Sequence, residues 1–188
     1  MIILGVDPGT LVTGYGVIEG TGRNIQLLSY DTIRNKSTVT MPIRLKSIYQ
    51  SLQCVIEKFS PDEFAIETAF YGKNAQSALK IGQARGIAIL ASVLSEIPTT
   101  EYSPREIKKA VVGNGAASKE QVQFMVKSLL NIKETPKLYD ATDALAVALC
   151  HYHRQTAPRA KFTDWKSFVE AHPDRVVKLS HSRTAKPS

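Results

Sequence analysis

Three extended segments open the sequence, and their place ahead of any helix constrains the fold more than any other feature does. Residues 2–7, 13–19 and 25–33 are rich in apolar and β-branched side chains, and short links containing Gly, Thr or Asn separate them. This spacing indicates an antiparallel meander of three strands. Any parallel strand added to such a sheet needs a longer crossover, usually a helix.

Helical and extended segments alternate in the rest of the chain. The expected elements are, in order, helix 41–58, strand 63–67, helix 75–95, strand 99–103, and helices over 104–112, from 118 and over 139–153. Ser118, with Gln121 three residues later, matches a capping box at the start of its helix. The order of elements predicts an α/β fold with a mixed five-stranded sheet and helices on both faces.

The charge is unevenly distributed along the chain, which has a formal net charge of +7. Residues 73–137 carry 10 Lys and Arg against 5 Asp and Glu, and residues 155–188 carry 7 against 3, whereas residues 1–72 carry 6 against 7. A basic surface of this kind indicates a polyanionic partner, most often nucleic acid. A solvated surface that only keeps the protein soluble would have the same composition.

The apolar pattern decays from Gln155 onward, where three prolines interrupt a polar and basic segment. We therefore predict one domain over residues 1–154 and a basic, flexible tail over residues 155–188. Within the tail, residues 162–170 alone have the aromatic spacing of a short amphipathic turn.

The cysteines and the amino-terminal residues indicate the cellular compartment of the protein. Cys54 and Cys150 lie in apolar runs without metal-ligand spacing, so both are expected to be buried and reduced, as in the cytoplasm. Met1 leads directly into a strand rather than a signal peptide. No apolar stretch looks long enough to span a bilayer, so no membrane association is expected.

Four carboxylates stand at the ends of predicted elements. Asp7 ends the first strand, Glu67 ends the fourth, and Asp140 and Asp143 open the last helix on one face. Each has a simple structural explanation by itself. Asp7 could cap a turn, Glu67 could be the first polar residue after a strand, and the helix acids could face a positive helix end.

Taken together, the four acids indicate a metal site. If the first and fourth strands are parallel neighbours, Asp7 and Glu67 end side by side, where sites in such sheets form. Converging carboxylates repel unless cations neutralise them, and these oxygen ligands favour Mg²⁺ or Mn²⁺. Two such ions about 3.5–4 Å apart can promote cleavage of a phosphodiester.

Several glycines allow more than one interpretation. Gly9, Gly14 and Gly16 would keep the backbone near Asp7 slim enough for a phosphate to approach, or would serve turn and strand geometry. Gly82 and Gly86 stand four residues apart on one helix and would allow close packing, either on the sheet or on a second copy of the chain.

Four segments form a pattern larger than any single motif. They are GVDPGTLVTGYGVIE, AIETAFYGKNAQSALKIGQARG, VVGNGAASKEQVQ and YDATDALAVALCH. In this order, over about residues 1–153, they resemble the RuvC crossover junction endodeoxyribonucleases. The tail beyond is not covered by the resemblance.

The resemblance implies a ribonuclease-H-like fold, a homodimer, and Mg²⁺-dependent cleavage of four-way (Holliday) DNA junctions by paired nicks in DNA recombination and repair. It implies two Mg²⁺ ions per site, with Mn²⁺ as a substitute. The catalytic and metal-binding positions fall on Asp7, Glu67, Asp140 and Asp143. Branch-migration motor proteins of the RuvA/RuvB type are the implied protein partners.

The resemblance also implies DNA contacts. They fall on Lys108 and Lys119, and a base-stacking aromatic falls on Phe70 with Tyr71 beside it. Lys73 lies in the same short loop, where an aromatic and a cation suit base stacking and phosphate contact. Core packing would also explain the two aromatics, and the lysine that follows Lys108 leaves that assignment ambiguous by one position.

Other functions share parts of this pattern. A ribonuclease-H-type nuclease acting on RNA–DNA hybrids would have the same acids, and a non-catalytic DNA-junction-binding protein would have the same basic segments. A phosphate-binding module of the actin and sugar-kinase kind uses a similar Asp-x-Gly-Thr turn, but 188 residues leave no room for its second lobe.

Overall fold

A five-stranded mixed sheet organises the molecule. The computed structural model describes residues 1–22, 24–68, 75–133, 139–156, 166 and 169–170. The strands are β1 (Ile2–Asp7), β2 (Val12–Thr21), β3 (Asn24–Arg34), β4 (Glu63–Glu67) and β5 (Thr99–Tyr102), in the order β3-β2-β1-β4-β5. β2 pairs antiparallel with β1 and β3, whereas β4 pairs parallel with β1 and β5. The predicted meander and the parallel pairing of the first and fourth strands are confirmed.

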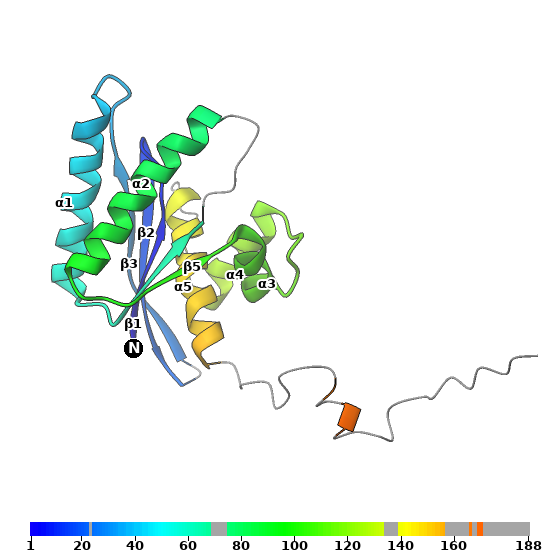
Figure 1. The fold of residues 1–188 in the computed structure, drawn as a ribbon. Helices are drawn as coiled ribbons and strands as arrows, with labels where there is room; N and C mark the ends of the chain where they lie inside the picture. The colour runs from blue at the N-terminus through cyan, green and yellow to red at the C-terminus, as the bar shows by residue number, and fades with distance from the viewer. Residues whose placement is uncertain (23, 69–74, 134–138, 157–165, 167–168, 171–188) are drawn as a thin grey trace, which may run out of the picture. The chain divides into compact units, whose positions relative to one another are not determined.

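Five helices cover the two faces of the sheet (Figure 1). One face carries α1 (Met41–Phe59) and α2 (Ala75–Leu94), and the other carries α3 (Pro104–Val112), α4 (Lys119–Leu129) and α5 (Tyr139–Thr156). Each face has its own apolar core. The predicted α/β architecture with helices on both faces is therefore confirmed.

Alternation along β1 and β4 decides which face their last side chains meet. Ile3 belongs to the core under α3, α4 and α5, whereas Leu4 and Val6 belong to the core under α1 and α2. Because successive strand residues point to opposite faces, Asp7 lies on the same face as Ile3. Glu67 follows in the same way from Ala65, which packs in the α5 core. Both acids thus belong to the face that α5 covers.

α5 lies unusually close to β1 and β2, because glycines face it. A Cβ on Gly14 would overlap the main-chain carbonyl of Asp140, and one on Gly5 would overlap that of Ala144. Gly16 meets the side chain of Leu145 in the same way. The space beside Gly14 and Gly16 is thus filled by α5, so the interpretation that these glycines admit a phosphate is wrong. Gly9 instead faces the Val12 carbonyl within its own turn.

α2 departs from the expected pattern of burial. Its buried residues are the small Ala84, Ala88, Ala91 and Ser92. The large side chains Leu79, Leu90, Val93 and Leu94 are exposed instead. Gly82 and Gly86 have nothing near their Cβ positions, so neither packs on the sheet.

The apolar composition of α2 also overturns the expectation that no stretch is long enough to cross a bilayer. By length and composition alone, this helix is a candidate span, the one found in the described part of the chain. Its alanines pack in the core beneath α1 and α2, and core helices of soluble proteins pass the same test. The finding is therefore weak evidence for a membrane.

Two further expectations change at the edges of the fold. Cys54 is exposed on α1 rather than buried, whereas Cys150 on α5 is buried as expected. α5 continues to Thr156, past the predicted boundary at residue 154. Residues 1–156 form one compact unit and residues 157–188 a second. Most of the stretch 162–170 lies outside the described residues.

Candidate active site

The carboxyl ends of β1 and β4 bring the first two acids together. Val6 pairs with Ile66 in the parallel ladder, so Asp7 and Glu67 are the next residues on adjacent strands. Thr68, just after Glu67, donates its main-chain N–H to the carbonyl of Tyr102 at 2.8 Å, which holds the end of β4 against β5.

The turn after Asp7 is closed by a buried threonine. The Thr13 hydroxyl donates to the Gly9 carbonyl at 2.5 Å and accepts the Gly9 N–H at 3.3 Å. Asp7 then pairs across the β1–β2 ladder with Gly14. This turn therefore fixes the position of Gly14, and α5 begins against Gly14.

The first turn of α5 brings the other two acids. Because Gly14 has no side chain, the Asp140 main chain lies directly on β2. It meets β2 at Gly14, the residue that pairs with Asp7 across the ladder. Asp143 follows on the same helical face, with 20% of its side chain exposed. The structure thus brings all four predicted acids to one end of the sheet.

A pocket of about 210 Å³ opens beside the acids. Glu67 and Asp143 line it together with Lys108 of α3 and Lys119 of α4. Its remaining walls are apolar and come from Pro104, Ile107, Val122 and Ala146. Lys108 lines the pocket, whereas Lys109 is exposed.

The acids disturb one another's protonation. Burial raises the pKa of Asp7 to about 7, and the charges of Asp143 and Asp140 add to the rise. Burial, followed by the charges of Asp7 and Asp143, raises the pKa of Glu67 to about 8. Burial also raises the pKa of Asp143, although Lys119 opposes that shift. Three neighbouring carboxylates with raised pKa values are typical of a functional site.

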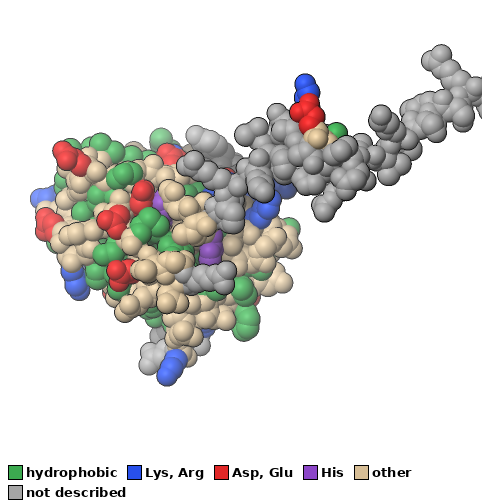
Figure 2. Space-filling view, turned by 90° about the horizontal axis from the view of Figure 1, so that it is seen from below, with side chains coloured by type: hydrophobic (Ala, Val, Ile, Leu, Met, Phe, Trp, Pro, Cys, Tyr) green, Lys and Arg blue, Asp and Glu red, His purple; other side chains and the backbone are tan. Residues whose placement is uncertain are grey.

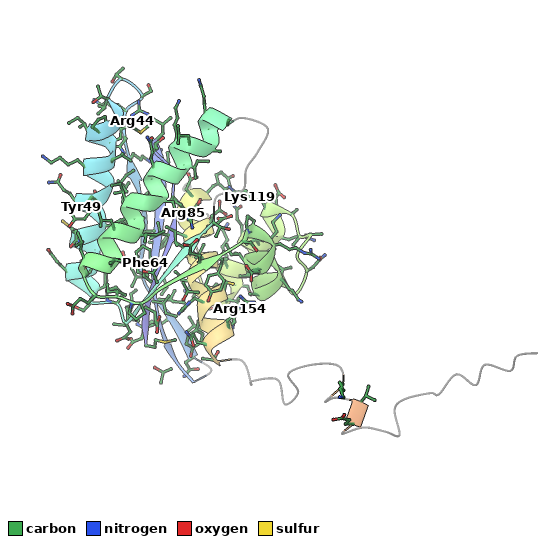
Figure 3. All side chains as sticks on the ribbon, viewed as in Figure 1. Arg44, Tyr49, Phe64, Arg85, Lys119 and Arg154 are labelled. Atoms are coloured by element: carbon green, nitrogen blue, oxygen red, sulfur yellow. The ribbon has the colours of Figure 1, made fainter. Side chains whose placement is uncertain are left out.

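Lys119 supplies a positive charge within this cluster. Its Nζ lies 2.6 Å from Oδ2 of Asp143 and 6.0 Å from the ring centroid of Tyr139. Burial lowers the pKa of Lys119, but the hydrogen bond and charge of Asp143 and the charges of Asp140 and Asp7 outweigh it, so the pKa is raised overall. In Figure 3, Lys119 lies near the amino end of α5, far from Arg154 at its other end.

The chemistry of these side chains suits a hard divalent cation. Four carboxylates offer oxygen ligands alone. Burial and mutual repulsion raise the pKa values of Asp7 and Glu67, and a cation would relieve both costs. As they stand, no three His, Cys, Asp or Glu side chains among the described residues are arranged to hold a metal ion. Asp143 is paired with Lys119 instead.

The remaining predicted site residues are Phe70, Tyr71 and Lys73, which lie outside the described residues. Two contributors were missed from the sequence. Tyr139 places its ring near the Lys119 ammonium, and Gly14 admits the Asp140 main chain. The small residues Ala141, Ala144 and Ala148 of α5, opposite a glycine-rich strand, were a signal for this close packing.

Comparisons with known proteins place this chain in a family. The family described as "Crossover junction endodeoxyribonuclease RuvC" matches residues 3–151. A relative of that name from Salinibacter ruber is 49% identical over 177 residues, covering 94% of this chain and 99% of the relative. Another from Photobacterium profundum is 57% identical over 152 residues, covering 81% and 87%.

Solved structures agree with the sequence comparisons. The Thermus thermophilus RuvC in complex with Holliday junction substrate superposes with a TM-score of 0.79 at 31% identity, over 83% of this chain and 95% of that one. The yeast mitochondrial Holliday junction resolvase Ydc2, at 16% identity and a TM-score of 0.57, shares the fold. With the match over residues 3–151, this chain belongs to the RuvC family of crossover junction endodeoxyribonucleases.

Proposed function

We propose that this chain is a structure-selective endonuclease that resolves four-way (Holliday) DNA junctions by paired, symmetric cuts in DNA recombination and repair. One observation carries the proposal most strongly. Four carboxylates meet at the carboxyl ends of two parallel strands beside two lysines, in a chain of the RuvC family. The solved relative from Thermus thermophilus is bound to a Holliday junction substrate.

Asp7, Glu67, Asp140 and Asp143 are assigned as the catalytic acids that hold two Mg²⁺ ions, with Mn²⁺ as a substitute. Asp7 would be the central ligand of the site, because the charges of both helix acids add to the rise in its pKa and its own charge raises the pKa of Glu67. When bound, the ions would supply Lewis acidity and lower the pKa of the attacking water.

The side chains around the acids would position the DNA. Lys108 and Lys119 are assigned to phosphate oxygens, since both line the pocket that Glu67 and Asp143 also line. Phe70 is assigned to stack on an unpaired base of the opened junction, with Tyr71 and Lys73 beside it. The basic tail, predicted over residues 155–188, would add nonspecific affinity for DNA.

A homodimer fits both the substrate and the surface. A four-way junction has two equivalent strands to cut, which suits a two-fold assembly. Leu79, Leu90, Val93 and Leu94 of α2 are exposed and share one helical face, which a second copy would cover. On the face seen in Figure 2, lysine and arginine side chains are few and scattered, which leaves that face less suited to DNA. Motor proteins of the RuvA/RuvB type and a cytoplasmic location complete the proposal.

The decisive experiment is cleavage of a synthetic mobile junction with and without Mg²⁺, with nicks mapped on all four strands. Symmetric, Mg²⁺-dependent nicks are expected, and Asp7→Asn should bind the junction without cutting it. Full cleavage by Asp7→Asn would overturn the assignment of the acids. Faster cleavage of an RNA–DNA hybrid than of the junction would favour a ribonuclease-H-type activity. Binding without nicks in any divalent ion would favour a non-catalytic role.

A further inference from the structure

The main chain of Lys119 is fixed in position, whereas its side chain is about half exposed. It is the first residue of α4, where the Gln121 N–H donates to the Ser118 hydroxyl at 3.3 Å and the Ser118 N–H donates to Gln121 Oε1 at 2.8 Å. This capping box fixes the backbone from which the lysine side chain extends. The side chain itself is 53% exposed, so its ammonium can change partners without any movement of α4.

The ammonium is placed to compensate an excess of negative charge. It pairs with Asp143 at 2.6 Å and also interacts with the charges of Asp7, Asp140 and Glu67. The charges of Lys119 and Lys108 face four acids, so the cluster stays under-compensated. No three acids are arranged around a common point in the described part of the chain.

This ion pair is easy to exchange. A lysine–carboxylate pair with half of the lysine exposed contributes little to stability. A divalent cation carries twice the charge and binds several carboxylates at once. Mg²⁺ and the ammonium would therefore compete for Asp143.

We propose that Lys119 is an exchangeable counter-ion: it neutralises the acid cluster through Asp143 until a divalent cation displaces it, and the released ammonium then binds a DNA phosphate. This inference rests on the proposed assignment of the four acids as metal ligands. Metal binding and DNA binding would then be coupled through one side chain, each favouring the other, as linkage requires.

Metal affinity in the absence of DNA tests the competition directly. In calorimetric titrations of the full chain with Mg²⁺ at pH 8, Lys119→Met is expected to bind the ion roughly fivefold more tightly than the wild type. Lys119→Arg keeps the charge and should stay near the wild-type value. Lys108→Met is the matched control, because Lys108 lines the same pocket and no ion pair joins it to the four acids in the described residues. It should change the affinity by less than Lys119→Met does.

Junction binding in Ca²⁺ and in EDTA tests the coupling, with a denaturing gel confirming that the DNA stays uncut. Wild type should bind the junction more tightly in Ca²⁺, and Lys119→Met should lose most of that gain. Lys108→Met should weaken binding about equally in both conditions. Circular dichroism of each variant checks that it is folded.

Two results would overturn the exchange. One is an Mg²⁺ affinity of Lys119→Met equal to or weaker than that of the wild type. The other is a gain in junction affinity in Ca²⁺ that is as large in Lys119→Met as in the wild type. If Asp7→Asn is inactive while either result is found, the nuclease assignment stands and the exchange alone fails. If Asp7→Asn still cuts junctions, the assignment of the acids fails, whatever Lys119 does.

Discussion

The two ends of α5 differ in how far their charged and polar side chains are compensated by partners. At the amino end, Asp140 and Asp143 lie beside Asp7 and Glu67, and the negative charges are only partly compensated. At the carboxyl end, several polar side chains have partners, although His151 Nε2 is buried without a hydrogen bond to any of the described residues. The Tyr102 hydroxyl and His151 Nδ1 are 3.0 Å apart, the Tyr152 hydroxyl donates to the Gly22 carbonyl at 2.9 Å, and Arg154 pairs with Glu106 at 2.9 Å. The amino end of α5 thus carries the candidate catalytic acids, and its carboxyl end carries contacts that hold the helix in place.

This difference teaches where the stability of the site comes from. Crowded carboxylates oppose folding, so the amino end of α5 must be held in place by contacts made elsewhere on the same helix. Those contacts include a continuous run of buried residues from Ala144 to Tyr152. Variants at the two ends should therefore separate loss of activity from loss of stability.

The largest effect is expected at Gly14. In Gly14→Ala, the new methyl group would overlap the Asp140 main chain and push the start of α5 away from Asp7. A displacement of about 1 Å can lower the cleavage rate roughly 100-fold. Single-turnover cleavage of a junction measures this.

Gly20→Ala is the control at the other end of the same contact, because a methyl group there would meet the ring of Tyr152. It should lower the melting temperature while folded protein still binds Mg²⁺ as the wild type does. Equal losses of Mg²⁺ affinity in the two variants would contradict the separation of roles.

The pH dependence of stability should reveal the acid cluster. Asp7 and Glu67 have pKa values raised from 3.8 and 4.5 to about 7 and about 8, so the folded state binds more protons than the unfolded state between these limits. The free energy of unfolding in EDTA should therefore fall as the pH rises from about 4 to about 8. Urea unfolding at several pH values measures this slope.

Asp7→Asn should flatten that slope, because it removes one shifted group and relieves the repulsion on Glu67. Mg²⁺ should flatten it too, since a bound cation takes the place of the protons. A stability that rises steadily over the same pH range would show that the carboxylates are already compensated.

A smaller effect is expected at Tyr152. Tyr152→Phe removes the hydrogen bond to the Gly22 carbonyl and should cost about 1 kcal/mol of unfolding free energy. The cleavage rate under saturating Mg²⁺ should stay unchanged, because the hydroxyl lies at the end of α5 away from the acids. A matched loss of activity without loss of stability would break the comparison between the two ends.

The smallest effect is expected at Arg154. Its ion pair with Glu106 is exposed, with 54% and 41% of the two side chains accessible, so Arg154→Ala should cost less than about 1 kcal/mol. The small cost should shrink further in high salt. Thermal unfolding at low and high salt measures both.

The sequence predicts much of this site because its logic is local. A strand that ends in an acid, such as β1 or β4, specifies the face and the edge that its last side chain reaches. The order of elements then makes these two strands neighbours. Asp140 and Asp143 follow from helical spacing in the same way.

What the sequence leaves out depends on packing between distant segments. The exposure of Leu90 and Leu94 could not be read from periodicity, because small alanines on the opposite side of α2 make the core contact. Gly14 carries no sign of its partner, since the Asp140 main chain approaches it only in the folded chain. The pairing of Lys119 with Asp143 likewise depends on where α4 meets α5.

The close approach of α5 to β2 has a consequence for engineering. Where Gly14 meets the Asp140 main chain, the spacing is set by the absence of a side chain rather than by the fit of one. Repacking the buried residues further along α5 could therefore raise thermal stability without shifting the acids. In a library selected for cleavage, these helix positions should accept a range of apolar side chains, except Ala148, which meets Gly5 and should stay small, and position 14 should accept glycine alone.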